Sequence, residues 1–263
     1  ASGLPHLQGY GDWPPIMQHV ALGDPIAGLN GAAAAVVGLF HQQRTGVGQL
    51  VDLSHVECLF PFAASGLVAE SLGSTLPRRH GHRHPHYAPH GVYRCAGEDR
   101  WVTIAATNKD QWESLTKAMD AAGLAADPRF ATLESRRENH DDLDKIISEW
   151  TIGQEAYQVT HKLQKAGVPA GPVLRGPDLL QDAHYNDRGT FVTVDHPQVG
   201  PKQYPGMPWR MSATPGQVRW PSPTLGQHNR DVYGELLGLT GPEIDQLEET
   251  EIIGTKPTGS RII

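Results

Sequence analysis

The distribution of apolar and polar residues predicts a long helix near the start of the chain. Residues 1–23 contain Gly, Pro and Trp without a sustained period, so we expect a loop there. Residues 26–43 are rich in Ala and almost wholly apolar, with Asp24 placed as N-cap and Pro25 as first helical residue. A helix that is apolar on all sides is expected to be buried. Glycines within residues 44–48 predict its end.

The remaining pattern alternates between short strands and amphipathic helices. Residues 50–53 predict a strand, Ser54 is placed to cap a helix over 55–71, and residues 73–90 are irregular. Two strands are expected to pair around a turn at residues 96–100. Those strands cover residues 91–95 and 101–105, and a further strand is predicted at 191–194. Helices are predicted at 110–122, 138–150, 154–166, 177–181 and 230–237, and residues 243–249 are expected to be a short tail.

This order of elements predicts an α/β protein in three parts. Residues 91–190 have strands and helices of their own and are expected to form a small α+β domain. Residues 1–90 and 191–263 flank it. Within the middle part, Trp101, Trp112 and Trp150 occupy amphipathic positions and are predicted to lie in the core.

Composition excludes several classes of protein. The 263 residues include 38% hydrophobic and 19% charged residues with a net charge of −7, so a nucleic-acid partner is not expected. Two cysteines, Cys58 and Cys95, match no zinc or redox spacing and fit a reducing compartment. We find no signal peptide and no apolar run of bilayer length, which predicts a cytoplasmic protein without a membrane partner.

Three groups of residues, taken in order, carry a family resemblance. The first joins Gly-Asp-Pro-Ile-Ala-Gly at 23–28 to Arg-Thr-Gly-Val-Gly-Gln-Leu-Val-Asp-Leu-Ser at 44–54. The others are residues 88–95, and residues 166–173 with the shorter matches at 195–197 and 223–228. Together they resemble the family III CoA-transferases of the CaiB/BaiF, formyl-CoA transferase and carnitine CoA-transferase type, from about residue 9 to about residue 253.

The resemblance implies a place in a larger fold. Family chains carry a doubly wound nucleotide-binding half before this point, and no glycine-rich phosphate motif occurs in these residues. Residues 1–90 would then be the C-terminal part of the large domain, and residues 191–263 an extended return segment and C-terminal helix that pack on it. The family's interlocked dimers imply a homodimer, or a partner chain that supplies the N-terminal half.

The resemblance places Asp24 at the position of the catalytic nucleophile. It implies that CoA moves from an acyl-CoA donor to a carboxylic acid acceptor through an aspartyl-CoA thioester, with CoA and acyl-CoA as substrates and no permanently bound cofactor. The local sequence alone favours another role, because Asp before Pro is a common helix cap. Both roles are compatible with one side chain.

A histidine-rich segment follows the predicted second helix. Five histidines lie within eleven residues, at positions 80, 82, 84, 86 and 90, but Gly and Pro are interleaved and Cys and carboxylates are missing, so we predict no metal site. The segment is either a solvated loop or a substrate loop. By the resemblance, residues 85–88 take the place of a mobile glycine-rich loop over the nucleophile. His86 and Tyr87, next to Ala88, could then donate hydrogen bonds to a substrate carboxylate.

One further histidine is a candidate. His55 follows the predicted strand, and the resemblance places it near the active site of formyl-CoA transferase. A lone histidine at a helix start more commonly has a structural role.

Two alternatives to CoA transfer stay open. A 2-methylacyl-CoA racemase uses a related scaffold and an Asp–His acid/base pair, whose His would precede this chain. The other is a non-catalytic subunit of a split or tandem CoA-transferase.

Overall fold

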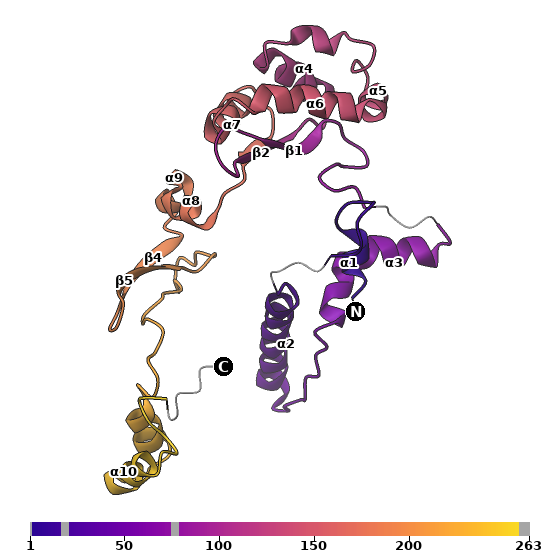
Figure 1. Ribbon diagram of the computed structural model, residues 1–263. Coiled ribbons are helices and arrows are strands. Elements are labelled where there is room, and N and C mark those ends of the chain that lie inside the picture. Colours follow the sequence, from indigo (N-terminus) through magenta and orange to yellow (C-terminus); the bar gives the residue numbers. More distant parts are fainter. Residues whose placement is uncertain (1, 17–20, 75–78, 258–263) are drawn as a thin grey trace. The chain divides into compact units, whose positions relative to one another are not determined.

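The computed structural model describes residues 2–16, 21–74 and 79–257, whose helices and strands are labelled in Figure 1. The chain divides into two units, Ala1–Val173 and Leu174–Ile263. Each unit combines helices with antiparallel strands. The division into domains at residues 90 and 190 stays a prediction about the whole family fold.

The first unit begins with helices. They are α1 (Leu4–Leu7), α2 (Gly23–Thr45), the 3-10 helix η1 (Glu57–Ala63) and α3 (Ala64–Ser71). The short α1 lies where we expected only loop. The prediction that Asp24 caps α2 is wrong: Leu22 is the N-cap and makes no side-chain cap, so Asp24 lies in the first helical turn. Gly46 ends α2 with a φ of 74°, a left-handed conformation that glycine adopts without strain.

The helix α2 is not buried, contrary to the expectation from its apolar sequence. Only Ile26 and Ala27 are buried, whereas Leu29 and Phe40 are 68% and 59% exposed. Among the described elements, η1 is the main one that packs on α2, so most of its surface has no cover within the chain. The predicted strand at residues 50–53 is also wrong, because this segment forms no ladder with another segment among the described residues.

By length and composition alone, α2 could cross a membrane, so the expectation that no apolar run reaches this length is wrong. Core helices of soluble proteins meet the same criterion, which makes a single such helix weak evidence.

A three-stranded sheet and its helices complete the first unit. The strands β1 (His90–Arg94), β2 (Trp101–Ala105) and β3 (Ala170–Pro172) are antiparallel in the order β1-β2-β3, which confirms the predicted pair of strands and adds a third. The helices are α4 (Lys109–Ala118), η2 (Ala122–Ala125), α5 (Leu133–Glu138), α6 (His140–Thr151) and α7 (Ala156–Lys165). The amphipathic helices predicted at 110–122, 138–150 and 154–166 are thus confirmed within a few residues.

The core of the first unit lies between this sheet and its helices. Trp112, Phe130 and Ile147 are fully buried in one hydrophobic cluster, with the Trp112 and Phe130 rings in an edge contact at 6.5 Å. The predicted core position of Trp112 is confirmed, while Trp101 and Trp150 are half-buried. Because protein interiors are closely packed, this cluster holds β1 and α6 in fixed positions relative to each other.

The second unit has little core of its own. It contains α8 (Gly176–Gln181), α9 (Ala183–Asp187), a hairpin of β4 (Phe191–His196) and β5 (Gly200–Pro205), a short π-helical turn η3 (Asp231–Leu236), and α10 (Gly241–Glu249). The predicted strand at 191–194 is confirmed, and η3 lies at the predicted last helix, 230–237. Residues 243–249, where we expected only a short tail, belong to α10. The second strand of the hairpin was not predicted, because its two prolines argue against a strand.

Candidate active site

The chain beyond α2 folds back along the helix and so returns to its first turn. An added Cβ at Gly31 would lie 3.9 Å from Leu53, and one at Gly23 would lie 3.7 Å from Leu59. Residues early in the helix therefore face residues late in the returning segment, which is an antiparallel arrangement. Ser54 accepts a hydrogen bond from the Glu57 N–H at 3.3 Å and starts η1 at this end.

This return path brings two of the sequence candidates together. The Nδ1 atom of His55 lies 3.7 Å from Oδ1 of Asp24. Their side chains are 65% and 76% exposed, so both are open to a substrate. An exposed pair of this kind adds little to stability. The two atoms are too far apart for a hydrogen bond, so what the structure shows is the proximity of the two side chains.

The position of Asp24 also suits an anionic nucleophile. It lies in the first turn of a 23-residue helix, where the positive end of the helix dipole stabilises negative charge. A hollow of about 460 Å³ opens between α2 and η1, but neither Asp24 nor His55 lines it. It is lined by Asn30, Asp52, Leu53, Ser54, Glu57, Cys58, Pro61 and Phe62. A carboxylate at an open helix start can attack a carbonyl carbon without first being uncovered.

The candidates in the histidine-rich segment form a second group. The rings of His84 and Tyr87 stack at 4.6 Å, and His86 lies 5.7 Å from His84. Partial burial and the neighbouring histidines lower the pKa of His84. Ala88 is buried, so it can contribute only through its backbone. Among the described residues, no hydrogen bond or ion pair joins Asp24 to His86, Tyr87 or Ala88.

The histidines do not form a metal centre as they stand. Within residues 2–16, 21–74 and 79–257, no three His, Cys, Asp or Glu side chains are arranged to hold a metal ion.

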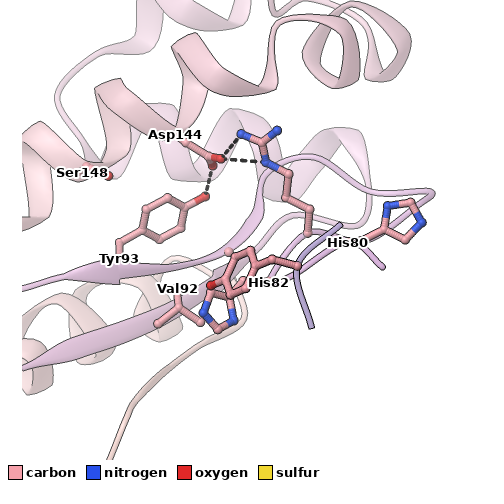
Figure 2. Close-up of a pocket in the computed structure, with 9 residues that line it drawn as sticks. His80, His82, Val92, Tyr93, Asp144 and Ser148 are labelled. Carbon is pink, nitrogen blue, oxygen red and sulfur yellow. Dashed lines mark hydrogen bonds and ion pairs between the residues drawn. The ribbon is translucent and has the colours of Figure 1, made fainter. Parts of the chain in front are cut away.

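A cluster around Asp144 was missed in the sequence (Figure 2). Oδ1 of Asp144 accepts a hydrogen bond from the Tyr93 hydroxyl at 2.8 Å, and Oδ2 accepts two from Arg83, at 2.7 and 3.0 Å. Burial and Asp144 raise the pKa of Tyr93 well above its ordinary value. The cluster borders a pocket of about 380 Å³ that also includes His80 and His82. The residues in these contacts are 51 and 61 positions apart in the sequence, so no local pattern predicts them.

The same cluster predicts a pH-dependent stability. His140 is buried, with Nε2 3.6 Å from Asp144, and faces the charges of Arg83, Asp141 and His90. Burial lowers its pKa, and Asp144 offsets only part of that shift. Because the unfolded chain binds the proton more readily, the free energy of unfolding should fall as the pH drops below about 6.5.

Urea unfolding of the wild type and of His140→Gln between pH 5 and pH 7.5 measures this effect. The variant should show a flatter pH profile, whereas replacing the exposed His161 by Gln should leave the wild-type slope. If the free energy of unfolding of wild type and His140→Gln changed equally with pH, the pH dependence would not come from His140.

Comparisons with known proteins extend over most of the chain. The sequence pattern described as CoA-transferase family III matches residues 1–229. The succinyl-CoA–D-citramalate CoA-transferase of Chloroflexus aurantiacus is 34% identical over 95% of this chain and 62% of its own length. The succinyl-CoA–L-malate CoA-transferase alpha subunit of the same organism is 32% identical, over 96% and 59%.

Solved structures show the same fold. A CaiB/BaiF family protein from Brucella suis is similar with a TM-score of 0.78 and 30% identity, covering 89% of this chain and 60% of that one. The chain thus spans about three fifths of the length of the relatives it matches.

Proposed function

The chain belongs to CoA-transferase family III, and from this premise we propose that the whole protein moves CoA from an acyl-CoA donor to a carboxylic acid with Asp24 as nucleophile. The observation that carries the proposal is the open Asp24 carboxylate in the first turn of α2, with His55 beside it. It occupies the position that the family resemblance assigns to the nucleophile.

The proposed reaction consists of four acyl-transfer steps. The Asp24 carboxylate attacks the thioester carbonyl of the donor, CoA thiolate leaves, and a mixed anhydride forms. The thiolate then attacks the aspartyl carbonyl, which releases the donor acid and leaves an aspartyl-CoA thioester. The acceptor carboxylate displaces the thiolate from Asp24, and the thiolate attacks the acceptor acyl group. Asp24 is regenerated, without net proton transfer or redox change.

The surroundings of Asp24 support individual steps. The positive end of the α2 dipole can stabilise the developing negative charge on the carbonyl oxygen. The attacking group must remain ionised, which the N-terminal end of the helix dipole favours. In this proposal His55 orients the Asp24 carboxylate, and His86 and Tyr87 donate hydrogen bonds to the carboxylate of the acid substrate.

The role of His55 leads to a graded prediction. Replacing His55 by Gln should lower kcat about three- to tenfold, because Asp24 keeps its chemistry and loses one orienting neighbour. Steady-state transfer kinetics measure the effect. His41→Gln, on the exposed far half of α2, is the control and should match the wild type. A loss of several thousandfold would instead make His55 an essential reacting group.

The assembly and location of the protein follow as part of the proposal. We expect an interlocked homodimer or a complex with a chain that supplies the nucleotide-binding half, acting in the cytoplasm. The exposed apolar residues of α2 support an interface with another chain or domain, because an apolar surface of this kind is unfavourable in water.

A CoA-exchange assay tests the proposed activity. The complete polypeptide is incubated with an acyl-CoA and a panel of dicarboxylic acids, and new acyl-CoA species are measured by mass. We expect transfer to at least one acid. A racemase would instead exchange the α-hydrogen of a 2-methylacyl-CoA with deuterium without any acceptor. Absence of both reactions would favour a non-catalytic subunit.

A further inference from the structure

The segment of residues 79–90 is tied to the rest of the first unit before it reaches its candidate residues. The Arg79 guanidinium donates hydrogen bonds to the carbonyl oxygens of Tyr10 and Trp13. The Gly81 N–H donates to the Gly9 carbonyl at 2.9 Å. These bonds hold the beginning of the segment against residues 9–13.

A charged contact holds the middle of the segment against α6. Arg83 donates through Nε and Nη2 to Asp144, and through Nη2 to Oδ1 of Asp141 at 2.6 Å. Asp144 is itself fixed by the Tyr93 hydroxyl on β1, as Figure 2 shows. An arginine that donates to one carboxylate through two of its nitrogens is held in a defined orientation. A lysine paired with a carboxylate is not, because its ammonium group is a single point charge on a flexible chain.

A third contact holds the end of the segment. Nε of Arg136, a buried residue of α5, donates to the Ala88 carbonyl at 2.7 Å. Nη1 of the same guanidinium donates to the Phe130 carbonyl at 3.0 Å, and the group lies 5.1 Å from the Trp112 ring. Ala88 is thereby bound to the hydrophobic core around Trp112 and Phe130.

Only residues 84–87 lie between these two contacts, and they carry the predicted substrate donors. His84 stacks on Tyr87, and the His86 N–H donates to Nδ1 of His84 at 3.1 Å. Donors that are already ordered lose less conformational entropy when a ligand binds. The direction of the Tyr87 hydroxyl therefore depends on where Arg83 and Ala88 are held.

We propose that Arg83 and Asp144 are positioning residues, whose ion pair sets the place of His86 and Tyr87 for the carboxylate of the acid substrate. The inference rests on the proposed function and adds two residues to its site. Neither residue touches the substrate; both act through the segment that they hold.

Transfer kinetics of the complete polypeptide test the proposal with Arg83→Gln. The KM for the acid should rise about tenfold and kcat should change less than about threefold, since the donors are displaced while Asp24 is intact. Arg129→Gln is the matched control, because Arg129 also pairs with two aspartates, Asp127 and Asp142, one of them on α6. It should keep the wild-type KM.

A double-mutant cycle with Tyr87→Phe separates positioning from general stability. In the wild type, Tyr87→Phe should raise the KM for the acid several-fold; in the Arg83→Gln background it should add little. Full additivity of the two changes, or a wild-type KM in Arg83→Gln, would overturn the proposal. Should Arg83→Gln not fold, Arg83→Lys takes its place in the cycle, with the same two results deciding.

The conservative variant provides a further readout. Arg83→Lys keeps the charge and loses the two-nitrogen contact, so its KM should lie between those of the wild type and Arg83→Gln. Failure of the wild type itself to transfer CoA would refute the proposed function, whereas transfer with a normal KM in Arg83→Gln refutes only the positioning role.

Discussion

Replacing Asp24 by Asn should lower the rate of CoA transfer by about 10⁴-fold or more, the scale expected when a covalent nucleophile is removed. An amide cannot form the mixed anhydride, and its size keeps the first turn of α2 unchanged. The KM for acyl-CoA should change little, because the amide side chain fits the space of the carboxylate. Steady-state kinetics with a discontinuous acyl-CoA assay cover the required range.

The matched control for this experiment is Asp110→Asn. Asp110 is also an exposed aspartate in the first turn of a helix, α4, so its loss removes the same kind of helix-dipole interaction. The control should retain wild-type kcat. A comparable loss in both variants would assign the effect to helix stability, and full activity of Asp24→Asn would remove Asp24 from the reaction.

Ile147→Ala should reduce the free energy of unfolding of the first unit by about 2–5 kcal/mol, as for other fully buried aliphatic residues cut to Ala. Ile147 lies on α6 with no exposed surface and belongs to the cluster around Trp112. The substitution removes its contacts and leaves a cavity that the surrounding helices fill only in part. Urea unfolding followed by tryptophan fluorescence measures the change.

Ile152→Ala provides the comparison at the end of the same helix. Ile152 is 49% exposed, and its truncation should cost less than about 1 kcal/mol. The difference between the two variants mainly reports burial, because the residue type is the same and Ile152 is the C-cap residue directly after α6. Equal losses would contradict the location of the core between α6 and the sheet.

Local patterns were enough to predict two strands, β1 and β2, and the three longer helices of the middle segment, but not β3, η2 or α5. The alternation in Trp101–Ala105 and the helical period of α6 and α7 arise from a one-sided core, which the structure contains. The pairing of β1 with β2 followed from their short connection. Asp24 was found through its family context and not through local chemistry, since an aspartate before proline most commonly caps a helix.

The sequence was less informative where contacts between residues far apart in the chain determine the structure. An apolar sequence like that of α2 indicates that burial of the helix is favourable. It does not show that other parts of the same chain bury it. The approach of His55 to Asp24 depends on the return path of the chain along α2. The contact of Arg83 with Asp144 spans 61 residues, and Arg83 stands among histidines whose spacing is the more prominent local feature.

The most direct test of the central claim is the mass of the complete polypeptide after incubation with an acyl-CoA donor. We predict an increase equal to one CoA, located by peptide mapping on the peptide that contains Asp24 and missing in Asp24→Asn. A polypeptide that transfers CoA at full rate without this adduct, or that carries it on another residue, would contradict the aspartyl-CoA mechanism.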